Sequence, residues 1–193
     1  MSNNAPSQPN NFAGFHIRQT PMTADEQVRA ERAQVIRNEI EEIVSVIGTS
    51  FLDRSPIIGA INPVAMPMTI TNSSDENGRV NVVGSVTFGS AYEGPPGCVH
   101  GGVIAAYFDE VCGVAQSTTG NPGMTVNLTI DYRAPTPLHK PLEFRAHVAS
   151  TEKRKIITKA SLHHEETLCA EATGIFVSMR PEVFERLTQL RDA

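Results

Sequence analysis

One segment of the chain, residues 97–110, combines a histidine, two consecutive glycines and two adjacent carboxylates. Asp109 stands in an otherwise apolar stretch whose only other charged side chain is its neighbour Glu110. A surface aspartate normally has charged residues around it, so this isolation argues for a carboxylate kept for chemistry. The residues alone leave a second interpretation open, in which Asp109 or Glu110 caps a helix or pairs with a partner across an interface.

Two features near Asp109 favour a site for a carbonyl group. Gly101 and Gly102 open the predicted helix, where unpaired backbone N–H groups and the positive end of the helix dipole face an approaching group. Donors of this kind stabilise an oxyanion, and the missing side chains allow close approach. The residues one and two turns from the acid are small and leave a trough over it: Gly102, Ala105, Ala106, Cys112 and Gly113.

The surrounding pattern predicts one helix held by an antiparallel sheet. The only long apolar helix spans about 101–117, and its packed stripe is Ile104, Tyr107, Phe108, Val111, Val114 and Ala115. Alternating apolar and polar residues, typical of strands, occur at about 80–88, 124–133, 142–148, 156–162 and 168–177. In the clearest strand one face is expected to hold Met124, Val126, Leu128, Ile130 and Tyr132. The predicted fold class is α+β, with the sheet wrapped around the helix.

The N-terminal part of the chain has a different character. Residues 1–22 have the polar, Pro-rich and Asn-rich composition of a flexible tail. Thr23 and Glu26 have the spacing of a capping box, and apolar residues at helical spacing then predict a helix that ends near Gly48. The predicted organisation is a tail over 1–22, a helical extension over 23–60 and one domain over 61–193.

Composition excludes several classes of function. The formal net charge of -5 over 193 residues gives no basic field for nucleic acid. No run approaches the ~20 apolar residues of a membrane span, and the N-terminus lacks the pattern of a signal peptide. Cys98, Cys112 and Cys169 show no disulfide or metal-site spacing, so we expect a reducing cytoplasm, no metal and no cofactor.

Several motifs occur in an order that resembles the PaaI-like and THEM4-like hotdog thioesterases. They are the His100-Gly101-Gly102 opening, the acid nine residues after that histidine, the strand Met124–Leu128 and the exit Asp131–Pro135. The resemblance covers about residues 80–179 and leaves residues 1–60 outside. It implies a hotdog fold, hydrolysis of acyl-CoA thioesters, and a homodimer or dimer of dimers in which each active site is made across the interface.

The resemblance also implies a role for each matched residue. Asp109 corresponds to the catalytic aspartate, as nucleophile or as general base on water, and the Gly102 backbone N–H to the group that polarises the thioester carbonyl. His100 is similar to the histidine that orders the loop and contacts the thioester region, although capping is the simpler interpretation of its position. Thr125 resembles the hydroxyl residue that places the attacking water from the partner subunit, and an ordinary strand residue is the alternative.

The CoA part of such a substrate carries phosphates, so a net-acidic chain needs a local group of cations to bind it. Candidate contacts for the substrate and its nucleotide end are Gly101, Asn127, Arg133, Lys153, Arg154 and Lys155. Lysine and arginine in a β-turn also serve simply to keep the turn soluble.

Four alternatives stay open on the sequence. Glu110 is a second candidate for the catalytic acid. Cys98 would need a nearby base to act as a nucleophile, and we interpret it as structural. A hotdog hydratase or dehydratase uses a histidine and an acid in a different motif, and a non-catalytic acyl-CoA-binding scaffold would keep the fold without turnover.

Overall fold

The computed structural model describes residues 23–46, 55–59, 65–76 and 78–191. They belong to two units, an N-terminal helix and a sheet unit, which are described separately. The tail predicted over 1–22 lies outside the described residues. The domain boundaries drawn from the sequence stay predictions.

Helix α1, Ala24–Val46, begins where the sequence predicts. The Thr23 hydroxyl and the Thr23 backbone N–H both donate to Glu26 Oε2 at 2.8 Å. In return, the Glu26 backbone N–H donates to Thr23 Oγ1 at 3.4 Å. This reciprocal arrangement confirms the predicted capping box, which satisfies donors that the first turn of a helix leaves free.

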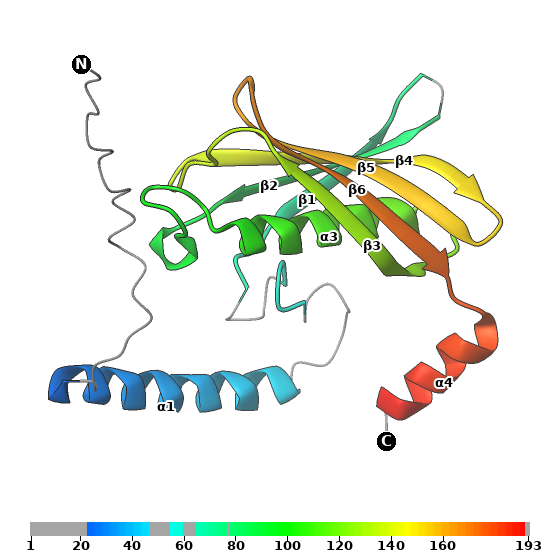
Figure 1. The fold of residues 1–193 in the computed structure, drawn as a ribbon. Coiled ribbons are helices and arrows are strands. Elements are labelled where there is room, and N and C mark those ends of the chain that lie inside the picture. The colour runs from blue at the N-terminus through cyan, green and yellow to red at the C-terminus, as the bar shows by residue number, and fades with distance from the viewer. Residues whose placement is uncertain (1–22, 47–54, 60–64, 77, 192–193) are drawn as a thin grey trace, which may run out of the picture. The chain divides into compact units, whose positions relative to one another are not determined.

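The sheet unit contains an antiparallel six-stranded sheet in the order β1-β2-β4-β5-β6-β3. Figure 1 labels these strands. The strands are β1 (Thr69–Ser74), β2 (Val80–Thr87), β3 (Gly123–Tyr132), β4 (Pro141–Glu152), β5 (Lys155–His164) and β6 (Thr167–Ser178). A short 3-10 helix, η1 (Ser90–Tyr92), follows β2. Strand β3 comes directly after the central helix in sequence yet pairs with β6 at one edge of the sheet. Its outer edge is therefore the end of the sheet.

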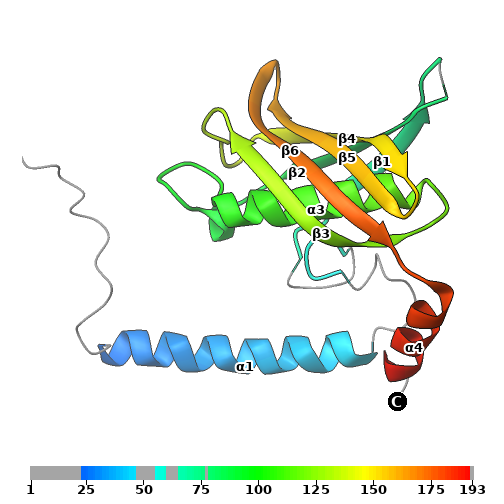
Figure 2. The ribbon, with the colours of Figure 1, turned by 45° about the vertical axis from the view of Figure 1, so that its right-hand side comes forward.

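Helix α3, Gly101–Ser117, lies along one face of the sheet (Figure 1 and Figure 2). The buried members of its predicted stripe are Ile104, Tyr107, Phe108, Val111 and Ala115, with Val114 partly buried beside them. Aromatic rings dominate this contact, since Phe108 meets Phe144 edge-on at 5.1 Å and Tyr107 meets Phe88 at 4.8 Å between ring centroids. The predicted α+β architecture, a sheet packed around one apolar helix, is confirmed.

Strand β3 carries a β-bulge that the sequence pattern does not reveal. Thr125 and Asn127 pair with consecutive residues of β6, so Val126 between them is an extra residue without a partner. An extra residue shifts the alternation of faces by one position. Thr125 therefore lies on the α3 side of the sheet together with Leu128. The expectation that one face holds all of Met124, Val126, Leu128, Ile130 and Tyr132 is wrong at the bulge.

A second helix of the sheet unit, α4 (Pro181–Arg191), follows β6, where no element is predicted from the sequence. Proline is well placed at its first position, because the N–H that proline lacks has no partner at a helix start. Of the helices in the described ranges, none combines the length and apolar character needed to cross a membrane.

Two glycines should respond in opposite ways to alanine. A β-carbon at Gly174 in β6 would lie 2.7 Å from Thr158 Oγ1 and 2.8 Å from the Phe176 ring, so Gly174→Ala overpacks the core. We expect it to lower the free energy of unfolding by about 1–3 kcal/mol. A β-carbon at Gly113 in α3 would meet nothing within 4 Å outside its own helix, so Gly113→Ala should raise that free energy by about 0.5–1 kcal/mol. Urea denaturation measures both, and changes of the same sign would contradict this packing.

Candidate active site

Asp109 lies on α3 at the point where Thr125 of β3 faces the helix. The Thr125 hydroxyl donates a hydrogen bond of 2.9 Å to Asp109 Oδ1. The bulge at Val126 turns Thr125 toward the helix, and the Asp109 side chain is only partly buried. Within the described part of the chain, Asp109 Oδ2 accepts no hydrogen bond. One carboxylate oxygen is thus fixed by a neighbour and the other is open to a further donor.

The start of α3 is built by a tight loop around His100. The Gly102 backbone N–H donates a hydrogen bond of 3.0 Å to His100 Nδ1, which makes His100 the N-cap of the helix. This nitrogen must be unprotonated to accept the bond. A β-carbon at Gly94 would lie 2.8 Å from the His100 Cα, so the loop can close only because Gly94 has no side chain. The capping interpretation of His100 is confirmed.

The peptide unit between Gly101 and Gly102 is held at both ends. Its N–H, on Gly102, donates to His100, and its carbonyl oxygen, on Gly101, accepts a hydrogen bond of 2.7 Å from the Tyr132 hydroxyl. The Gly102 N–H is therefore not a free donor in this structure. The Tyr132 contact is missing from the sequence prediction, where the only signal is an aromatic residue with a polar tip at the end of a strand.

Asp109 and Gly102 lie on the same side of α3 but far apart. Positions 102 and 109 differ by seven, which is nearly two helical turns and about 10 Å along the helix axis at a rise of about 1.5 Å per residue. A carbonyl oxygen sits about 3 Å from its donor, and a water sits at a similar distance from its base. A base at Asp109 and a donor at Gly102 of the same helix would therefore have to act across about 10 Å of helix.

Glu110 is engaged by a different segment. The Ser55 hydroxyl donates to Glu110 Oε1 at 2.9 Å and accepts two backbone N–H groups of its own turn. Burial raises the pKa of the Glu110 carboxyl above its usual range, the Ser55 hydrogen bond opposes this shift, and the charge of Asp109 adds to it. Glu110 thus fastens residues 55–59 to α3. Nothing in the sequence signals this contact, because its two residues lie 55 positions apart.

Cys112 is predicted to line the open side of α3 with Asp109, and that prediction is wrong. The residue is buried in the core, where a β-carbon on Gly174 would come within 3.3 Å of it. Burial raises the pKa of its thiol to about 11, so it stays protonated at neutral pH. The half-buried members of the predicted trough are Ala105, Ala106 and Gly113. These three still leave room beside the carboxylate.

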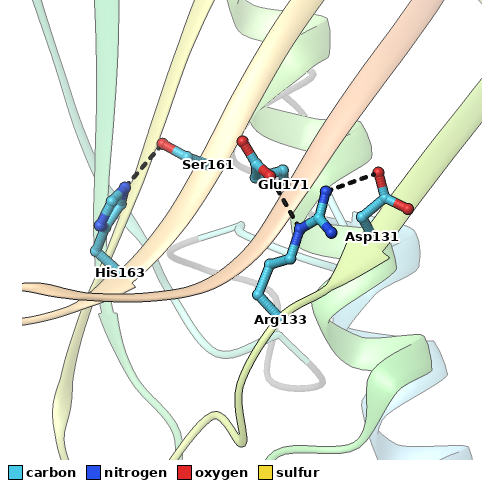
Figure 3. Close-up of polar contacts among 5 residues, drawn as sticks. All are labelled: Asp131, Arg133, Ser161, His163 and Glu171. Atoms are coloured by element: carbon cyan, nitrogen blue, oxygen red, sulfur yellow. Dashed lines mark hydrogen bonds and ion pairs between the residues drawn. The ribbon is translucent and has the colours of Figure 1, made fainter.

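Arg133 and Asn127 lie on the sheet face opposite α3, as Figure 3 shows for Arg133. Arg133 Nε donates to Glu171 Oε2 at 3.0 Å, and a second guanidinium nitrogen donates to Asp131 Oδ2 at 3.4 Å. Asn127 accepts a hydrogen bond of 3.1 Å from the Thr129 hydroxyl. A phosphate at Arg133 would have to compete with two carboxylates. Within one chain, neither side chain is brought to Asp109.

The three turn cations lie at one end of the sheet. Lys153 and Arg154 form the turn between β4 and β5, and Lys155 opens β5. Arg154 Nε donates to the Ser178 backbone carbonyl at 2.9 Å, and all three side chains are exposed. Because β5 and β3 both begin opposite the last residues of β6, this is the end of the sheet that carries Thr125.

Comparison with known proteins gives the family. A sequence model of the thioesterase superfamily matches residues 96–171. The crystal structure of a thioesterase superfamily protein matches the fold with a TM-score of 0.63 and 32% sequence identity, covering 80% of this chain and 83% of the other. The chain belongs to the thioesterase superfamily. Its matched region contains all four residues predicted for catalysis, His100, Gly102, Asp109 and Thr125.

Two further proteins match shorter parts of the chain. Acyl-coenzyme A thioesterase THEM4 of Xenopus laevis is 37% identical over 95 residues, which are 48% of this chain and 43% of that protein. The chain thus spans less than half the length of this relative. A Streptococcus mutans protein with bound acetyl CoA matches with a TM-score of 0.52 and 17% identity, over 58% of this chain and 88% of that one. At that identity the likeness shows the fold alone.

Glu110→Gln should stabilise this superfamily member at neutral pH and lose that advantage in acid. A raised pKa in the folded state means that the stability contributed by the protonated carboxyl is complete below the unfolded pKa, near 4.5, and is lost as the pH rises through the folded pKa. Glutamine keeps an oxygen for the Ser55 hydroxyl and carries no charge. The free energies of unfolding of variant and wild type should therefore diverge as the pH is raised from about 4 to about 7.

Glu166→Gln is the matched control, since Glu166 is exposed in the turn between β5 and β6. We expect no comparable divergence for this variant. A Glu110→Gln chain less stable than wild type at neutral pH would show instead that the ionised carboxylate stabilises the domain through Ser55.

Proposed function

We propose that the chain hydrolyses acyl-CoA thioesters, with Asp109 as the general base on the attacking water. The observation that carries the proposal is the 2.9 Å hydrogen bond from Thr125 to Asp109, which fixes one carboxylate oxygen and leaves the other open. The relative named acyl-coenzyme A thioesterase supports this substrate class. Attack by Asp109 itself as nucleophile is the alternative.

The Thr125–Asp109 pair is suited to holding a water molecule. Thr125 uses its proton on Asp109, so its oxygen can accept a hydrogen bond from a water that also donates to Asp109 Oδ2. That water directs a lone pair at the thioester carbon. On attack, a water proton passes to Asp109 and a tetrahedral intermediate forms. Its collapse breaks the C–S bond and releases the free acid and the CoA thiolate, which takes up the proton.

The oxyanion of this intermediate needs a hydrogen-bond donor, and the proposal assigns the Gly102 backbone N–H. The N-terminal end of a helix carries partial positive charge, and donors oriented before the substrate arrives are the effective ones. In the free chain this N–H is bonded to His100 Nδ1. The thioester oxygen has to share or replace that acceptor, so His100 keeps the N–H oriented until substrate binds.

We infer that each complete site uses two copies of the chain. Asp109 and Thr125 meet within one chain, whereas Gly102 lies about 10 Å away along the same helix. A second α3, antiparallel to the first and related to it by two-fold rotation, would place its Gly102 opposite Asp109 and create two equivalent sites. The proposal thus differs from the expectation that Thr125 reaches Asp109 from the partner subunit, because it takes the glycine-bearing turn as the part that the partner supplies.

Strand β3 provides a surface for this association. It forms one edge of the sheet, and its apolar side chains Met124, Val126 and Tyr132 are 55%, 60% and 54% exposed. Apolar side chains along a sheet edge favour pairing with another strand. A homodimer joined along β3 is therefore part of the proposal, and the opposite sheet face stays available for a dimer of such dimers.

For the nucleotide end of CoA, the proposal assigns the turn cations Lys153, Arg154 and Lys155, which are exposed although Arg154 Nε also donates to the Ser178 carbonyl. Gly101 stands at the thioester end with its neighbour Gly102. Arg133 and Asn127 are second choices, because both are engaged on the far sheet face. A reducing cytoplasm is retained as the location, since the cysteines Cys98, Cys112 and Cys169 are free thiols.

Asp109→Asn and Glu110→Gln, the same change at adjacent positions, test the assignment of the base. The assay is a panel of acyl-CoA thioesters of increasing chain length with a thiol reagent that detects released CoA. We expect turnover by the wild type, a loss in kcat of about a hundredfold or more for Asp109→Asn, and only a few-fold change for Glu110→Gln. Thr125→Val should lower kcat by about tenfold or more, and Thr125→Ser, which keeps the hydroxyl, should restore most of it.

Each contrary result has a definite meaning. The reverse order of the two acid variants would assign Glu110 as the base. A wild type that binds acyl-CoA and releases no thiol would be a non-catalytic binding protein, and conversion of an enoyl-CoA without thiol release would identify a hydratase.

Mixed pairs of inactive chains test the two-copy site. Asp109→Asn chains mixed with Gly102→Val chains should regain activity, because a mixed dimer has one site with both defects and one site with neither. With random mixing, half of the dimers are mixed and half of their sites are intact, so about a quarter of normal activity should return. Asp109→Asn mixed with Thr125→Val should regain none, because the proposal puts both residues on the same chain of a site.

Subunit exchange is first verified with two affinity tags. With exchange established, rescue by the Thr125→Val chain and not by the Gly102→Val chain would restore the original assignment of Thr125 to the partner subunit.

A further inference from the structure

We propose that Tyr132 is a positioning residue for the oxyanion donor and acts through the Gly101–Gly102 peptide. The inference rests on the proposed function, because it takes the Gly102 N–H as the donor to the thioester oxygen. Tyr132 is the last residue of β3, and its hydroxyl donates a hydrogen bond of 2.7 Å to the Gly101 carbonyl oxygen. This contact comes from the strand that also carries Thr125.

The atom that Tyr132 contacts and the N–H assigned to the oxyanion belong to one rigid plane. The carbonyl of Gly101 and the N–H of Gly102 are the two ends of a single peptide unit, which cannot twist about its C–N bond. Fixing the oxygen therefore fixes the direction of the N–H at the opposite end. A hydrogen bond accepted at the oxygen also polarises the amide, so the N–H becomes a stronger donor.

The plane lies in the first turn of α3, where the backbone hydrogen bonds of the helix also hold it. Both of its residues are glycines, so neither has a side chain that packs against the loop. A β-carbon at Gly101 would lie 3.4 Å from the Tyr132 hydroxyl, which places the tyrosine directly against the turn. His100 holds the N–H end at 3.0 Å, but that bond is the one a thioester oxygen has to share or replace. The Tyr132 bond lies at the other end and can persist throughout the reaction.

The Tyr132 hydroxyl keeps its proton under the conditions of the reaction. Burial raises the pKa of this group above its usual range, so it stays a neutral donor at and well above neutral pH. Under the proposed two-copy arrangement, β3 then contributes to two sites. Its Thr125 serves the carboxylate of one site, and its Tyr132 orients the peptide that its own helix presents to the other.

Tyr132→Phe removes only the hydroxyl, and Tyr107→Phe is a matched control. The Tyr107 hydroxyl also donates to a backbone carbonyl, that of Met66, away from the glycine turn. Removing a direct oxyanion donor costs about a hundredfold or more in kcat, so loss of its support should cost less, about tenfold. We expect Tyr132→Phe to lower kcat by about that factor with KM within about twofold. Tyr107→Phe should lower the melting temperature and leave kcat within about twofold.

NMR spectra of the same variants report on the Gly101–Gly102 peptide directly, without substrate. Gly101–Gly102 is the only pair of consecutive glycines in the sequence. Cell-free synthesis with glycine labelled at the carbonyl carbon with 13C and at nitrogen with 15N therefore gives one coupled carbonyl–amide signal in an NMR correlation spectrum. Tyr132→Phe should move this signal in carbon, nitrogen and amide-proton dimensions, and Tyr107→Phe should leave it in place.

The outcomes separate this inference from the proposed function. An active wild type whose kcat is the same after Tyr132→Phe, or whose loss is matched by Tyr107→Phe, overturns the role of Tyr132 and leaves the proposed function standing. A rise in KM without a fall in kcat also overturns it, because Tyr132 would then contact substrate directly. A wild type without thioesterase activity overturns the proposed function and the role of Tyr132 with it. A fall in kcat together with a moved signal supports the inference.

Discussion

The candidate site depends on one extra residue in β3. Side chains alternate between the two faces of a strand, so a regular β3 with Leu128 on the helix side would also direct Val126 at α3 and turn Thr125 away. An apolar side chain would then cover the Asp109 carboxylate. The bulge at Val126 changes the face between these positions and brings a hydroxyl onto the acid. Bulges commonly redirect a side chain in this way next to functional sites.

A second constraint comes from the length of a helical turn. Helix α3 carries a carboxylate in its middle and a backbone donor at its start, and the rise of the helix fixes about 10 Å between them. The helix is held against the sheet by packed aromatic rings, so this separation is rigid. Under the proposed mechanism a rigid helix does not bring both groups to one carbonyl, so the proposal uses a second chain rather than a conformational change within one.

The sequence predicts the structural features that depend only on residues close together in the chain. The limits of α3, its buried stripe, the capping box at Thr23 and the N-cap at His100 all follow from residues within one or two turns. The face of β3 on which Thr125 lies could not be predicted in this way, because it depends on the register of β3 against β6. The contacts of Ser55 with Glu110 and of Tyr132 with Gly101 join residues 55 and 31 positions apart. The position predicted for Cys112 was wrong because the sheet covers more of the circumference of α3 than the predicted apolar stripe. Residues at the edge of that stripe are therefore buried too.

The position of β3 at the edge of the sheet has a consequence for control of the proposed activity. Under the proposed arrangement a lone chain is fully folded and keeps its Thr125–Asp109 pair, yet has no donor opposite its carboxylate. Dilution below the dissociation constant of the dimer then switches catalysis off without unfolding anything, and specific activity becomes a function of enzyme concentration. A peptide that adds itself to the β3 edge would act as an inhibitor with no resemblance to the substrate and no need to enter the acyl site.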